Sequence, residues 1–176
     1  MPDPIEFENP DGLAAGAVGE PGAREFFIQA RSGGAQLTVL VEKEQVAILA
    51  REALAFLDRL DADDPLRGEV AVPSPTDAEV REPTVPLFRA QVIGLGYDPT
   101  RQRVIIELRE YSESDGDDED ALDEEPDGFV ARVYATRQQV KVMARAGADA
   151  VTRGRPDCPL CGQPMGPERH ICPRLN

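Results

Sequence analysis

The sequence predicts an α+β protein: two βββα repeats that share one antiparallel sheet, with two helices on one face of it, followed by a tail that resembles a zinc knuckle. Three observations lead to this prediction. Twice along the chain, apolar residues form short strands and then a helical stripe. The two stripes lie 94 positions apart. All three cysteines and the only histidine fall within fifteen consecutive positions near the C-terminus.

The first repeat, residues 13–60, follows a polar lead-in that contains proline and, at residues 5–7, a short strand. Three strands are expected between glycine-containing turns, over residues 13–18, 26–31 and 36–41. A helix is expected over residues 42–60, because its apolar residues recur with a period near 3.6. Its stripe consists of Val46, Leu49, Ala50, Ala53, Leu54 and Leu57.

A proline-rich linker, residues 61–86, separates the two halves; its five prolines suit an extended chain better than a helix or strand. The second repeat, residues 87–152, contains an acidic loop at 112–127. Its helix begins after Thr136, whose side chain can form a capping box with Gln139. The expected strands of this repeat cover residues 87–96, 103–110 and 129–135.

The second helix repeats the first stripe at a constant offset of 94 positions. Upstream, residues 20–31 align with residues 98–109 at an offset of 78, so that Gly16 meets Gly94. The two offsets differ by about the length of the acidic loop, which favours an internal duplication with one insertion. The alternative is that two α+β segments resemble each other because hairpins and amphipathic helices are common. The second stripe consists of Val140, Met143, Ala144, Gly147, Ala148 and Val151.

The formal charge of −14 is concentrated in one segment. Residues 113–127 contain ten acidic residues and no basic one, which leaves −4 for the rest of the chain. The body is therefore not expected to bind nucleic acid, because such binding depends on Lys and Arg neutralising phosphates. The acidic run is expected to be a solvated loop, with weak cation binding or a basic partner as the alternative. No signal peptide or membrane-spanning pattern is found, so a cytoplasmic protein that does not bind membranes is expected.

The chain is divided into a body, residues 1–152, and a tail, residues 153–176. The metal-binding pattern lies in the tail. A CxxC pair, Cys158 and Cys161, can reach one ion from a tight turn, and His170 with Cys172 supplies a second pair. Together these residues form the Cys3His ligand set of a closed tetrahedral zinc site, with a structural role. A redox CxxC, thiols without a metal, or a site completed by another chain are the alternatives. A catalytic zinc is not favoured, because it keeps a coordination position open for water.

The tail motif CPLCGQPMGPERHICPR, together with GEPGAREFFIQAR and EKEQVAILAREALAFLD in the first half, resembles an uncharacterised actinobacterial family of unknown function, also described as repeat proteins. The resemblance covers nearly the full length, and Cys158, Cys161, His170 and Cys172 match the family's tail positions. Members of that family are often encoded near a histidine-phosphatase-like protein and a kinase-like protein. The resemblance therefore implies a shared pathway with such proteins and implies nothing about mechanism.

Two functions are compatible with the sequence. The first is a non-enzymatic binding or adaptor protein, in which the zinc-containing tail docks on a protein partner; its local excess of arginine suits an acidic surface. The second is an enzyme with a pocket between the two repeats. Its candidate residues are Glu107, Arg109 and Arg31, although charged residues on strands more often form a solvated face. The sequence does not indicate an oligomeric state.

Overall fold

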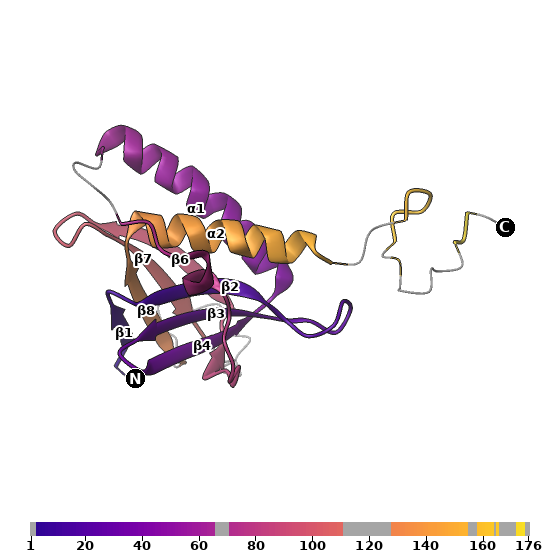
Figure 1. The fold of residues 1–176 in the computed structure, drawn as a ribbon, viewed down its shortest axis with the longest axis horizontal. Helices are drawn as coiled ribbons and strands as arrows, with labels where there is room; N and C mark the ends of the chain where they lie inside the picture. The colour runs from indigo at the N-terminus through magenta and orange to yellow at the C-terminus, as the bar shows by residue number, and fades with distance from the viewer. Residues whose placement is uncertain are drawn as a thin grey trace, which may run out of the picture.

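The computed structural model describes residues 3–65, 71–110, 128–154, 158–163, 165 and 172–174. The predicted elements of both halves are found, most of them within a few residues of their expected ends. In chain order they are β1 (Ile5–Glu8), β2 (Gly12–Val18), β3 (Glu25–Ser32), β4 (Ala35–Val41), α1 (Lys43–Asp63), the 3-10 helix η1 (Pro75–Ala78), β5 (Phe88–Arg89), β6 (Val92–Asp98), β7 (Arg103–Arg109), β8 (Val130–Ala135) and α2 (Arg137–Thr152) (Figure 1).

The strands form two four-stranded sheets, in the orders β1-β8-β7-β6 and β2-β3-β4-β5. The prediction of one shared antiparallel sheet was therefore wrong. In each sheet, three antiparallel strands from one half are completed by a short parallel strand from the other half: β1 pairs with β8, and β5 pairs with β4. The single strand expected over residues 87–96 is likewise two strands, β5 and β6, which belong to different sheets.

The chain changes direction where it passes from one sheet to the other. Between β1 and β2, Asn9 has a φ of 50°, a left-handed conformation that Asn adopts more readily than most residues. Pro10 follows it, where a missing N–H does not interrupt either ladder. These few residues allow β1 to pair in one sheet while β2 begins the other.

One core lies between the sheets and helices. Val104, Ile106 and Leu108 of β7 are fully buried, and their cross-strand partners on β8 are the buried residues Ala135, Val133 and Ala131. Both helix stripes contribute to the same core, so the two halves are packed around shared apolar surface. Burial of this surface supplies the main driving force for folding.

The two helices pack closely against each other and lie along the same side of the strands in Figure 1. Gly147 of α2 lies close to both α1 and β2. A Cβ atom there would lie 3.1 Å from Val46 of α1 and 3.3 Å from the Cβ of Ala15 in β2. The glycine therefore lets α2 contact both elements. Within the described part of the chain, neither helix combines the length and the apolar composition needed to cross a membrane.

Candidate metal centre

The CxxC pair lies on a tight turn just beyond α2. The backbone N–H of Gly162 donates to the Cys158 carbonyl at 2.8 Å, and the N–H of Cys158 donates to the Gln163 carbonyl at 2.8 Å. Gly162 has a φ of 71°, in the left-handed region where glycine is unstrained. The glycine after the second cysteine thus closes the tight turn that was expected for the CxxC pair.

Three of the four predicted ligands are brought together by this turn and by Cys172. Their sulfur atoms all lie within 4.8 Å of one another, and those of Cys158 and Cys172 are 3.9 Å apart. Two thiolates bound to one tetrahedral zinc ion with 2.3 Å bonds have sulfurs about 3.8 Å apart. Cys158 and Cys172 are buried and Cys161 is partly buried, and no disulfide joins the three residues. The cluster has the spacing needed to hold a metal ion.

The backbone of the turn favours a thiolate at the first position. The N–H groups of Cys161 and then Leu160 hydrogen-bond to the Cys158 sulfur and lower the pKa of that thiol. The Gln163 N–H acts in the same direction on Cys161, but burial and the neighbouring Cys158 thiol outweigh it and raise the pKa of Cys161. Metal binding requires the deprotonated form, so the backbone of the turn favours the metal-binding form of Cys158 more than that of Cys161.

The fourth predicted ligand, His170, lies outside the described residues, as does the acidic loop at 112–127. The geometry of the centre therefore rests on the three thiols. Three soft thiolates with one imidazole would suit zinc, and oxygen-preferring cations such as Mg²⁺ and Ca²⁺ would not be favoured.

The residues considered for catalysis do not form one site. Glu107 and Arg109 lie on β7, where the Arg109 Nε donates to the Glu107 carboxylate at 2.6 Å. Arg132 on β8 donates to the other carboxylate oxygen at 2.7 Å. Burial would raise the pKa of Glu107, but the hydrogen bonds from Arg132 and Arg109 outweigh it, so the pKa is lowered. A carboxylate held ionised by two arginines is typical of a structural ion-pair network.

Arg31 lies on β3, in the other sheet, where it holds the linker. Its guanidinium donates to the backbone carbonyls of Asp77 at 2.7 Å and Glu79 at 3.0 Å, and to the Gln29 side chain at 2.8 Å. Gln29 is fully buried and also binds the linker, through the Arg81 carbonyl at 2.8 Å. The donors of Arg31 are thus used to fix residues 77–81 over the sheet.

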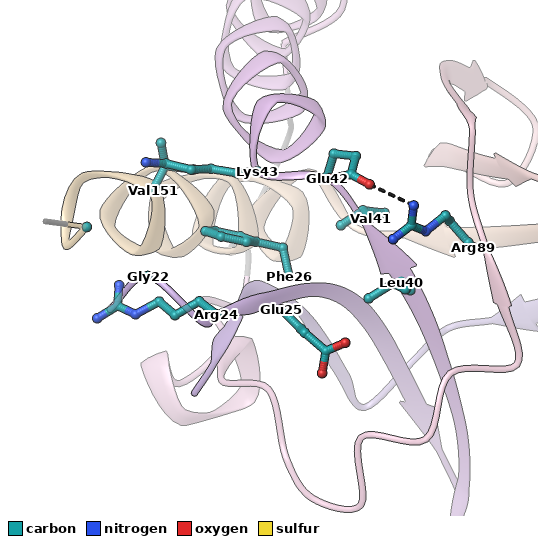
Figure 2. A pocket seen from close by; sticks show the side chains of 11 residues that line it. Gly22, Arg24, Glu25, Phe26, Leu40, Val41, Glu42, Lys43, Arg89 and Val151 are labelled. Atoms are coloured by element: carbon teal, nitrogen blue, oxygen red, sulfur yellow. Dashed lines mark ion pairs between the residues drawn. The ribbon is translucent and has the colours of Figure 1, made fainter. Parts of the chain in front are cut away.

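A pocket of about 310 Å³ lies where the ends of β3 and β4 meet the start of α1 and the end of α2 (Figure 2). Arg89 forms an ion pair with Glu42 at 3.0 Å on one side, and Arg24 and Lys43 lie on the other, with the Phe26 ring between. Among the described residues that line it, none is Ser, Thr, Cys or His. The pocket offers three cations, two carboxylates and apolar surface, without a hydroxyl, thiol or imidazole group in its described lining.

One alternative from the sequence placed a pocket between the two repeats, but its candidate residues Glu107, Arg109 and Arg31 do not line this pocket. Its cationic residues come from three separate segments, and Arg89 reaches it only because β5 pairs with β4, opposite Leu40. That parallel pairing joins residues far apart in the chain and leaves no periodic signal in either segment. No local pattern could therefore have identified the group.

One family model matches the chain: Protein of unknown function (DUF3090), over residues 5–172. The match spans the body and continues into the tail as far as Cys172. No curated protein and no solved structure matches the chain.

Proposed function

We propose, for a chain that belongs to the family described as Protein of unknown function (DUF3090), a non-enzymatic binding or adaptor role in which the tail holds one structural zinc ion. The observation that carries the proposal is the convergence of three cysteine sulfurs within 4.8 Å. His170 completes the site as the fourth ligand. Four protein ligands leave no position for a reacting water, so the ion stabilises the tail and does not catalyse a reaction.

The zinc-bound tail would dock on a partner protein that has an acidic surface. Leu160, between the two cysteines of the turn, is 47% exposed and offers an apolar contact. The sequence of residues 153–176 contains four arginines and only two acidic residues. A cytoplasmic location suits this role, because a reducing compartment keeps the thiols available for the metal.

The body of this binding protein is an internal duplication. The cross-strand registers support it: residues 26–41 correspond to residues 104–135, with β3 and β7 offset by 78 positions and β4 and β8 by 94. The first hairpin needs one adjustment. Val18 and Asp98, which end β2 and β6, are 80 positions apart. The turn between β2 and β3 is two residues longer than the turn between β6 and β7. With this offset of 80, Gly16 corresponds to Gly96 and not to Gly94.

Contacts between the halves repeat in the same way. The Asn9 N–H donates to the Tyr134 carbonyl at 3.2 Å, and the Ala90 N–H donates to the Leu40 carbonyl at 2.9 Å. Leu40 and Tyr134 are 94 positions apart, the offset of the helices. Each helix has a glutamine in its N-terminal capping box, Gln45 in α1 and Gln139 in α2. Both capping glutamines also reach the opposite half: Gln139 donates to the Pro10 carbonyl and Gln45 to the Ala90 carbonyl. Equivalent long-range bonds favour duplication over chance resemblance.

The docking role is tested by comparing partners captured by the wild type and by a Cys158→Ser plus Cys161→Ser variant in the native host. Gln163→Ala is the matched control, because it changes an exposed side chain of the same turn and leaves Leu160 and every ligand in place. Partners lost from the double variant would support docking through the zinc-bound tail. Partners that are retained by a variant without zinc would contradict it.

A further inference from the structure

An open apolar groove of about 340 Å³ lies between α1 and β6. Its side chains are mostly uncharged, and the one acid, Glu52, forms an ion pair with Arg51 at 2.9 Å. Ile48 is 51% exposed although it is a large apolar residue. It lies outside the stripe of α1 that packs in the core. The groove is lined by Gln45, Ile48, Leu49 and Glu52 of α1 and by Ile93 and Leu95 of β6.

The groove runs beside a sheet edge with which no other strand pairs in the described part of the chain. β6 is the last strand of its sheet, and no strand among the described residues pairs with its outer side. Residues 92–97 of β6 contain no charged side chain and no proline. Proteins usually protect such edges with charges, proline, bulges or a covering segment, because the free N–H and C=O groups can pair with another chain.

The matching groove on the other side of the molecule, between α2 and β2, is filled. Residues of the linker, including Pro73, Asp77 and Ala78, pack there against Leu13 and Val142 and leave no space that a water molecule could enter. Ala78 is only 4% exposed. The linker thus covers the edge strand β2, which is otherwise placed like β6.

Residues at equivalent positions in the two grooves are more buried in the α2–β2 groove, which the linker covers, than in the α1–β6 groove. Leu13 of β2 is 2% exposed, whereas Ile93, 80 positions later, is only partly buried. Val142 of α2 is partly buried under the linker, whereas Ile48, 94 positions earlier, is exposed. The two grooves are built alike, and among the described residues only the α2–β2 groove is filled, by a proline-containing segment that includes the 3-10 helix η1.

We propose that the α1–β6 groove binds a proline-containing peptide segment of a partner protein, which places apolar side chains in the groove as the linker does in the other one. The β6 edge offers backbone hydrogen bonds to such a segment, and the groove offers apolar contacts to its side chains. The inference deepens the proposed binding role by naming the class of partner. It places that partner on the body, independently of the zinc-bound tail.

The test uses the full-length protein and, as probe, a fluorescent peptide with the sequence of residues 71–83, AVPSPTDAEVREP. Ile48→Glu puts a charge in the groove at an exposed position that folding does not require. Val85→Glu is the matched control, because Val85 is 78% exposed and lies outside the groove. Fluorescence anisotropy should show binding to the wild type and to the control, and binding at least about tenfold weaker to Ile48→Glu, a difference of about 1.4 kcal/mol. Circular dichroism verifies that both variants are folded.

Three results would overturn the proposal: no binding at millimolar protein, equal binding by Ile48→Glu and wild type, or a wild-type dimer that Ile48→Glu converts to a monomer. The last result would identify a second copy of the chain as the occupant. The Cys158→Ser plus Cys161→Ser variant should bind the peptide as the wild type does. A result against peptide binding by the groove can therefore be told apart from a result against docking through the zinc-bound tail.

Discussion

Arg137, the first residue of α2, donates hydrogen bonds to both the backbone carbonyl and the carboxylate of Asp64, at 2.6 and 3.0 Å. It also donates to the Asp61 carboxylate at 2.8 Å and to the Tyr97 hydroxyl at 3.0 Å, and its side chain is only 4% exposed. A cation at a helix N-terminus is disfavoured by the helix dipole. The acceptors at the C-terminal end of α1 offset this cost and join that end to the N-terminal end of α2.

Replacement of this arginine should therefore destabilise the body. Arg137→Met removes the charged hydrogen bonds while keeping most of the side-chain volume. We expect the free energy of unfolding to fall by about 2 kcal/mol, measured by urea denaturation. Arg145→Met, an exposed change on the same helix, should alter it by less than about 0.5 kcal/mol. Equal effects of the two substitutions would contradict the role of Arg137.

Gly147 is the point at which α2 approaches both α1 and β2. Gly147→Val would place its side chain against Val46 and Ala15, where even a Cβ atom lies within 3.3 Å of a neighbour. The resulting overpacking should cost about 1–3 kcal/mol and lower the midpoint of thermal unfolding. A more stable variant would mean that the helices can separate without cost.

The capping glutamines join each helix to the other half of the chain. Gln139→Ala removes the bond to the Thr136 N–H, at 2.9 Å, and the bond to the Pro10 carbonyl. The loss should cost about 1 kcal/mol or more. Gln45→Ala should have a similar effect in the first half, measured in the same urea titration. A large effect at only one of the two positions would argue against equivalent halves.

Glu107 should contribute to the pH dependence of stability. Because its pKa is lowered in the folded protein, its contribution is present above its unfolded pKa of about 4.3 and is lost as pH falls through the folded value. Glu107→Gln cannot titrate, so it should be less stable than wild type at neutral pH, and the difference should shrink on acidification. Urea titrations from neutral pH to about pH 3 measure this. A difference that is constant with pH would exclude the contribution.

The local parts of this fold could be predicted from the sequence. The strand expected over residues 103–110 is found as β7, where Val104, Ile106 and Leu108 are buried, and the Thr136 capping box is present with Gln139 at the expected position. Such features depend on neighbouring residues in one element. The turn that carries Cys158 and Cys161 was predictable for the same reason.

The exchange of short strands between the halves could not be predicted from periodicity. β5 has only two residues, Phe88 and Arg89, which are too few to show an alternating pattern. Its pairing with β4 crosses 48 positions between Leu40 and Arg89 and depends on the assembled core. For the same reason the sequence suggested one sheet and did not show the pocket or the open groove.

The central claim, that the tail holds one structural zinc ion, is tested most directly by mass spectrometry under native conditions on protein purified without chelator. The wild type should carry one zinc ion per chain, Cys158→Ser should lose it, and His170→Cys should retain it, because a fourth thiolate can replace the imidazole. Chelation should unfold the tail and leave the circular dichroism of the body unchanged. Wild-type protein without zinc, or a Cys158→Ser variant that binds it equally well, would contradict the claim.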